Sequence, residues 1–145
     1  MTLKITAADA IAGLNAIVAR IGNGAGPNPV LNIYDGVEPD YVTDSITTQK
    51  TLVTIALAAT NAFGGGVDVI GEDYVEATAA PIADTPALED GDAKWFRVFD
   101  KDGNARWQGS VTETGGGGDL EISSIKIIEG VNVVTVSLNV RMPKR

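Results

Sequence analysis

The chain has 145 residues, a formal net charge of −8, and neither cysteine nor histidine. This length fits one domain whose hydrophobic core can hold the fold without covalent cross-links. Disulfides are excluded, and so are metal, haem and iron–sulfur sites that use thiolate or imidazole ligands. We therefore expect a single domain over residues 1–145, with no metal and no cofactor.

The charges are unevenly distributed along the chain. Twelve acidic residues and one basic residue, Lys50, lie between Asp35 and Asp92, whereas eight basic and six acidic residues follow from Lys94 onward. An acidic segment of this kind repels phosphate backbones, so we expect no nucleic-acid partner. The segment is either a solvated face that keeps the protein soluble or a surface complementary to a basic partner.

The sequence contains no run of about 18 apolar residues, which argues against a membrane-spanning helix. The alanine-rich stretch near the N-terminus is interrupted by Asp9, Asn15 and Arg20. It is therefore amphipathic, unlike the apolar region of a signal peptide. We expect no membrane association, and synthesis in the cytoplasm.

One helix is predicted, over residues 7–21. Thr6 and Asp9 form a variant of the capping box, with aspartate in place of the usual glutamate. Apolar side chains recur at helical spacing at Ile11, Leu14, Val18 and Ile21. Gly22 is expected to end the helix in the left-handed conformation. The apolar face either packs on the protein's own sheet or docks on a partner or a sister subunit.

From residue 29 onward the hydrophobic pattern has a period of two, which is typical of strands. Strands are predicted at residues 30–34, 51–58, 73–78, 93–99, 105–111, 120–128 and 131–142. Turn sequences at 100–104 and 129–130 indicate two hairpins. The last strand alternates apolar with polar residues from Val134 to Met142, so one of its faces should be buried and the other solvated.

These elements predict a mainly β protein: an antiparallel, jelly-roll-like β-sandwich of about seven or eight strands with one N-terminal α-helix. Residues 1–22 would form the helix or arm, and residues 29–143 the sandwich. Three segments rich in proline, glycine, aspartate and alanine, at 36–50, 58–72 and 79–92, should be long loops. Loops of this length in a compact domain are usually functional or ordered by a partner.

One segment resembles the start of a calcium-binding loop, because Asp100, Asp102 and Asn104 occupy the positions of the first ligands. The pattern fails further on, where Ala105 and Val111 stand in place of the required glycine and glutamate. We therefore interpret the segment as a turn between two strands.

No other pattern supplies catalytic residues. Adjacent carboxylates such as Glu89 and Asp90 are expected to be solvated, because neighbours along a strand point to opposite faces. The same geometry separates Ser123 from Lys126, whereas a serine nucleophile needs a base beside it. The sequence thus predicts no catalytic residue and no enzymatic activity.

The aromatic residues concentrate on one predicted hairpin, at Trp95, Phe96, Phe99 and Trp107. We expect Trp107 to lie across the hairpin from Trp95, with the rings packed in the core. The alternative is a pair of exposed tryptophans that stack on sugar rings, as in a carbohydrate-binding module.

Several runs of residues carry a resemblance to a known group of proteins. They are LNIYDG at 31–36, WFRVFDKDGN at 95–104, WQGSV at 107–111, GGDLEISS at 117–124, and the valine-rich strand that ends in Met142 and Pro143. In these runs the chain resembles small virion proteins of tailed bacteriophages, the head decoration or cement proteins, over residues 30–143. The resemblance implies a non-enzymatic jelly-roll-like protein, made in the host cytoplasm, that forms a homotrimer and binds the major capsid protein on the capsid surface.

The interaction surface is expected on the helix and on aromatic side chains in or beside the long loops. The candidate interaction residues are Ile11, Leu14, Val18, Tyr41, Phe63 and Tyr74. A decoration protein would use such residues to bridge major capsid subunits and to contact sister copies. The alternatives are a neck, tail or fibre component with the same sandwich, which would occur in far fewer copies per virion, and a carbohydrate-binding module.

Overall fold

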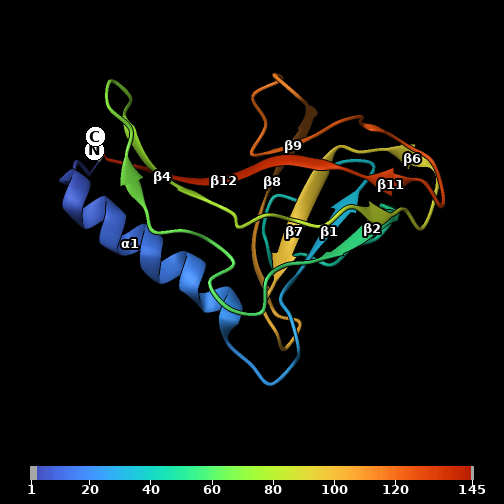
Figure 1. Cartoon of the computed structure of the whole chain (residues 1–145), viewed down its shortest axis with the longest axis horizontal. Helices are drawn as coiled ribbons and strands as arrows, with labels where there is room; N and C mark the ends of the chain where they lie inside the picture. Colours follow the sequence, from blue (N-terminus) through green and yellow to red (C-terminus); the bar gives the residue numbers. More distant parts are fainter. Residues whose placement is uncertain (1–2, 145) are drawn as a thin grey trace.

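The computed structural model describes residues 3–144. The protein is mainly β, with one N-terminal helix and a mixed sheet of eight strands, which confirms the predicted fold class (Figure 1). The helix is α1 (Ala7–Ala19), followed by a 3₁₀ turn at Arg20–Gly22. In spatial order the sheet consists of β2 (Thr51–Ala56), β1 (Val30–Tyr34), β7 (Trp95–Phe99), β8 (Ala105–Glu113), β9 (Leu120–Ile122), β12 (Thr135–Pro143), β4 (Tyr74–Thr78) and β3 (Val67–Asp68). Two short ladders complete the β-structure: β10 (Lys126–Ile127) with β6 (Gly91–Asp92), and β11 (Asn132–Val133) with β5 (Thr85–Pro86).

The sheet is strongly twisted, so that β12 crosses the direction of β7 and β1 (Figure 1). One continuous core cluster includes side chains from β1 and β7, from β4 and β12, and from the helix. The strands predicted at 30–34, 51–58, 73–78, 93–99 and 105–111 are confirmed, with ends that shift by no more than two residues. The period-two pattern therefore located correctly those strands that pair within the eight-stranded sheet along their whole length.

The helix begins as predicted but ends differently. The Thr6 hydroxyl oxygen accepts a hydrogen bond from the Asp9 amide (3.1 Å) and donates one to the Asp9 carboxylate (2.9 Å). The prediction that Gly22 is left-handed was wrong. The last turn tightens instead, and the Asn23 amide donates to the Arg20 carbonyl at 3.1 Å, which satisfies an end carbonyl without a positive φ.

The apolar face of α1 packs on the protein's own sheet. Leu14 is fully buried and Val18 is nearly so, and the helix contacts β3, β4 and β12 (Figure 1). Of the two alternatives for this face, the structure has the intramolecular one. Burial of a leucine side chain stabilises a fold by about 2 kcal/mol, so the helix contributes to the core and is not a detached arm.

The hairpin of β7 and β8 has a register that sequence reasoning missed. Trp95 pairs with Ser110, and Val98 pairs with Trp107. The prediction that Trp107 lies opposite Trp95 was therefore wrong. The cause is the turn and an irregularity beside it, where the register shifts between Val98 and Phe99.

One pair of neighbouring strands is parallel, β8 with β9, although the connection between them is short. Four consecutive glycines, Gly115 to Gly118, make this reversal possible. Gly115 and Gly117 have φ of 85° and 81°, and a Cβ on Gly116 or Gly118 would come within 2.7 or 2.8 Å of the Thr112 side chain. The glycine run is thus required by the backbone path.

The predicted C-terminal hairpin exists only near its base. β9 pairs with β12, and one further hydrogen bond joins the Ser123 amide to the Val134 carbonyl at 3.0 Å. Beyond it the two chains separate, and β10 and β11 pair with β6 and β5 instead. As a result Val134 and Val136 are 37% and 49% exposed, whereas Leu138 is buried. The expectation of one fully buried face on this strand was wrong at its start, because the register shifts between Thr135 and Ser137.

Residues from distant parts of the chain fix the hairpin formed by β3 and β4. The Lys144 amide donates to the Asp73 carbonyl at 3.0 Å, and the Lys144 ammonium pairs with the Asp68 carboxylate and donates to the Val69 carbonyl at 3.2 Å. Next to β3, the Gly64 amide donates to the Thr78 carbonyl at 2.9 Å. These contacts tie the hairpin to the C-terminal end of β12 and to the segment before β3.

Candidate functional site

The longest irregular segment, residues 35–50, lies against the outer face of β1, β7 and β8, and we call it the acidic loop. Arg97 of β7 is 3% exposed and lies beneath this loop. Its guanidinium donates hydrogen bonds to the carbonyls of Asp44 (2.8 Å) and Tyr41 (3.4 Å). A buried cation is costly unless its donors are satisfied, so the loop carbonyls and Arg97 depend on each other.

Gln108 of β8 also holds the acidic loop, and we call Arg97 and Gln108 together the clamp. Its side-chain oxygen accepts hydrogen bonds from the Arg97 guanidinium at 3.0 and 2.8 Å. Its side-chain nitrogen donates to the Pro39 carbonyl at 2.6 Å. Two side chains of the sheet thus hold three carbonyls of the acidic loop, and they fix the loop from below.

The base of the loop is fixed separately. Trp95 stacks on Tyr34 with ring centroids 4.3 Å apart, and its indole nitrogen donates to the Asp35 carbonyl at 3.1 Å. The Asp35 carboxylate accepts a hydrogen bond from the Lys50 amide at 2.6 Å, which joins the first and last parts of the loop. Trp95 is itself 1% exposed, so it packs as the core interpretation predicted and cannot stack on a sugar.

The side chains that the acidic loop presents to solvent combine apolar and acidic groups. Val37 is 80% exposed and Tyr41 is 70% exposed. Glu38, Asp40 and Asp44 are exposed beside them. An aromatic anchor with a charged surround, held on a rigid scaffold, is the usual composition of a protein-recognition loop.

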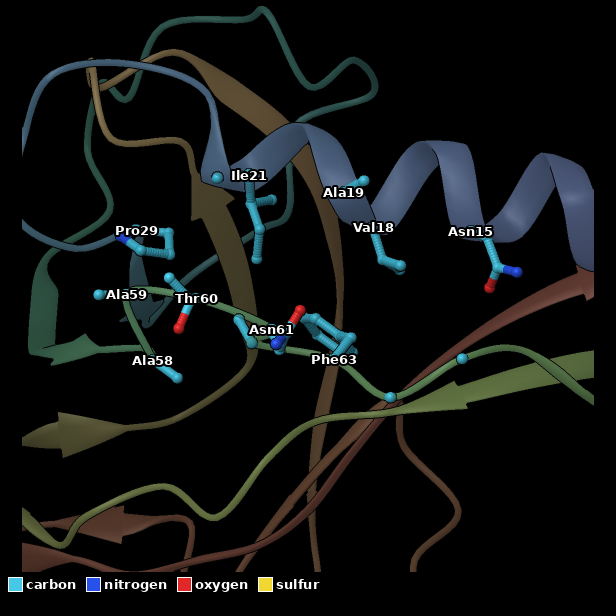
Figure 2. A pocket seen from close by; sticks show the side chains of 14 residues that line it. Asn15, Val18, Ala19, Ile21, Pro29, Ala58, Ala59, Thr60, Asn61 and Phe63 are labelled. Carbon is cyan, nitrogen blue, oxygen red and sulfur yellow. The ribbon is translucent and has the colours of Figure 1, made fainter.

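A cleft of about 270 Å³ lies between the end of α1 and residues 58–65. Figure 2 shows Val18 and Ile21 pointing from the helix toward the segment that carries Asn61 and Phe63. Asn61 has a φ of 50°, a left-handed conformation that asparagine tolerates better than most residues. The residues that line the cleft include no titratable side chain, so the cleft supplies no group for acid–base chemistry.

The structure does not bring the six predicted interaction residues together. Leu14, Val18 and Phe63 are buried, Ile11 and Tyr74 are partly buried, and Tyr41 is exposed. The Phe63 ring packs edge-on against Trp107 at 5.6 Å, and the Arg141 guanidinium lies 4.6 Å from the centre of the Tyr74 ring. Of the six, Tyr41 is the residue whose ring is available to a partner as the protein stands.

Sequence reasoning missed the two residues that position Tyr41. Arg97 and Gln108 occupy ordinary alternating positions on predicted strands, and neither belongs to a motif that marks a buried residue. The available signal was that Arg97 faces the same side as Trp95, two residues before it. An aromatic residue and a cation on one strand face can indicate a covered face rather than a wet one.

The segment that resembles a calcium loop is a turn, as predicted. The Asp100 carboxylate accepts hydrogen bonds from the amides of Asp102 (3.0 Å) and Asn104 (2.9 Å) and from the Arg106 guanidinium (2.6 and 2.9 Å). Burial alone would raise the pKa of Asp100, but these hydrogen bonds outweigh it and hold the pKa below its ordinary value. The Asp100 carboxylate therefore stabilises the turn by accepting these hydrogen bonds.

Neither a metal cluster nor a membrane span is found between residues 3 and 144. Within that range, no three or more acidic side chains come close enough together to hold a metal ion. No helix in the same range is long and apolar enough to cross a membrane.

No protein-family model, no curated protein and no solved structure matches this chain. The features that bear on function are therefore the acidic loop, the cleft and the exposed surfaces, together with the resemblance in sequence.

Proposed function

We propose that this protein is a non-enzymatic structural protein of a tailed-bacteriophage virion, a decoration or cement protein that binds the capsid surface and bridges major capsid subunits. The observation that carries the proposal is the clamp on the acidic loop. Arg97 and Gln108 hold the loop in one conformation and leave Tyr41 exposed on top of it.

The clamp favours binding over catalysis. The buried guanidinium of Arg97 donates hydrogen bonds to the carbonyls of Tyr41 and Asp44, and it does not line the cleft beside α1. The cleft beside α1, in turn, is lined by no titratable side chain. The polar side chains of Arg97 and Gln108 thus hold the acidic loop in place, and a protein that functions by binding needs an ordered surface of this kind.

A rigid loop suits a protein that binds in many copies. Because the loop is already ordered, little conformational entropy is lost when it meets a partner. Each copy needs only a modest contact, since sister copies in a homotrimer and neighbouring trimers on one shell reinforce one another. The sequence resemblance to head decoration proteins supports the same assignment.

Sedimentation with undecorated capsid shells tests the proposal. We expect the wild-type protein to be retained on the shells and Tyr41→Ser to be retained at least about tenfold less, because burial of an aromatic anchor typically contributes that much. Ile70→Ser is the matched control, since Ile70 is 87% exposed on a different hairpin, and it should bind like the wild type. No retention of the wild-type protein would overturn the proposal.

Copy number in purified virions separates the two virion locations. Quantitative mass spectrometry should give a number comparable to that of the major capsid protein if the protein decorates the shell. A small fixed number would instead place it in the neck, tail or fibre.

A further inference from the structure

A second exposed apolar surface lies where two irregular segments meet, and we call it the apolar tip. It consists of Leu88, Ile128 and Val131, which are 54%, 55% and 55% exposed. Their segments are joined by backbone hydrogen bonds, from the Ala87 amide to the Val131 carbonyl (3.0 Å) and from the Gly130 amide to the Ala87 carbonyl (2.9 Å). The three exposed residues therefore lie on neighbouring segments that are bonded to each other.

The apolar tip is fixed to the sheet. The Leu88 amide donates to the Leu52 carbonyl of β2 at 2.8 Å. The Val131 amide donates to the Ile128 carbonyl at 3.0 Å, which closes a turn, and Gly130 in that turn has a φ of 80°. Exposed apolar side chains on an ordered turn are available to a partner without a prior folding step.

Carboxylates alternate with these apolar residues along the chain. Glu89 and Asp90 follow Leu88, and Glu129 follows Ile128, all of them exposed. The Asp90 carboxylate accepts a hydrogen bond from the Glu129 amide at 2.7 Å, which holds the two acidic segments next to each other. The ammonium of Lys50, the last residue of the acidic loop, donates a hydrogen bond to the Asp90 carbonyl at 2.8 Å.

We infer that the apolar tip docks on a partner protein that offers an apolar hollow surrounded by lysine or arginine side chains. The charges decide this against a second copy of the chain, because a two-fold contact through the tip would bring the exposed carboxylates of Glu89, Asp90 and Glu129 against the same acidic patch of the other copy. They also decide against lipid, since anionic headgroups repel the same carboxylates. The inference rests on the proposed function only for the identity of the partner as a capsid protein.

A pair of synthetic peptides tests the chemistry of this surface directly. The peptides have equal length, one alternating lysine with leucine and the other glutamate with leucine, and each is titrated into the full-length protein and followed by amide NMR shifts. We expect the lysine–leucine peptide to shift the amides of residues 87–91 and 127–132, and this effect to fade at about 0.5 M salt, where charges are screened within a few ångströms. The glutamate–leucine peptide should shift none of them.

Matched variants separate the apolar contribution from general attraction to an acidic protein. Leu88→Ser and Val131→Ser should each weaken binding of the lysine–leucine peptide about tenfold, whereas Ile70→Ser should not. Both variants replace side chains that are more than half exposed, and an unchanged thermal melt verifies that they fold. Equal effects of Leu88→Ser and Ile70→Ser, or shifts that cluster elsewhere, would overturn the inference.

Two further outcomes keep this inference apart from the proposed function. Self-association of the protein that Leu88→Ser abolishes would show that a second copy covers the tip, and it would overturn the inference. Shell binding that is lost in Tyr41→Ser but unchanged in Leu88→Ser would uphold the proposed function and reject the tip as a docking surface.

Discussion

Arg97 and Gln108 lie directly opposite each other on β7 and β8, and the Gln108 oxygen accepts two hydrogen bonds from the Arg97 guanidinium. The partners of this buried cation are neutral: one side-chain amide and the carbonyls of Tyr41 and Asp44. A carboxylate in the same place would neutralise the charge of the guanidinium, which a neutral amide does not. With an amide there, the cation also needs the loop.

Arg97→Met should release the acidic loop. Because the Gln108 amide and two carbonyls lose their donor, the free energy of unfolding should fall by about 2–4 kcal/mol. Hydrogen exchange is the more decisive measurement, and amides of residues 38–46 should exchange faster while those of β1 and β7 keep their protection. Arg141→Met, which breaks a half-exposed pair with Glu76, should cost less than about 1 kcal/mol. Unchanged exchange in the loop would contradict the clamp.

Asp100→Asn should make the protein less stable at neutral pH and less sensitive to acid. The folded-state pKa of Asp100 is lowered, so its ionised form contributes stability that is present above the unfolded pKa of about 3.9 and is lost as pH falls through the folded pKa. We expect a loss of about 1–3 kcal/mol at pH 7, measured by urea unfolding from pH 7 to pH 2. The difference from wild type should shrink at the acid end.

Asp102→Asn is the control on the same turn. The Asp102 carboxylate is exposed and accepts a hydrogen bond from the Ala25 amide at 3.0 Å. It should therefore change stability much less than Asp100→Asn. An equal loss in both variants would mean that the turn responds to any lost charge and not to the buried carboxylate.

Two glycines near the end of the helix should respond oppositely to alanine. A Cβ on Gly22 would meet no atom within 4 Å, and Gly22 has no positive φ, so Gly22→Ala should be neutral or stabilise by up to about 1 kcal/mol. Gly24 has a φ of 118°, and a Cβ there would lie 2.5 Å from the Asp102 side chain. Gly24→Ala should lower the melting temperature clearly, and tolerance of it would show that this segment adjusts freely.

Leu14→Ala should destabilise the protein by about 2–5 kcal/mol, because it leaves a cavity under the helix. Ile17 of the same helix is 39% exposed, so Ile17→Ala should cost about 1 kcal/mol or less. Deletion of residues 1–22 should abolish the cooperative melt, measured by circular dichroism. A truncated protein that still melts cooperatively would mean that the sheet folds without the helix.

Local patterns were enough to predict the helix, most strands and the turn at Asp100, since caps, periodicity and turn residues act between near neighbours. They could not predict the clamp, because Arg97 and Tyr41 are 56 residues apart and alternation says which face a side chain takes but not what covers that face. The parallel pairing of β8 with β9 was missed for a related reason. A run of four glycines carries no periodic pattern of its own, and the need for glycine there depends on the position of the Thr112 side chain.

The contacts of Lys144 with the β3–β4 hairpin bear on how copies of the protein could associate. Lys144 ties down the hairpin whose outer strand, β3, is only two residues long, and at the opposite margin the chain at Leu88 is bonded to β2. Among the described residues, the margin at β3 therefore offers only a very short strand for pairing with another chain, which disfavours growth into a continuous multi-chain sheet on that side. If copies of the protein associate at that margin, they must therefore meet mainly through side chains, and each copy would keep its own separate sheet.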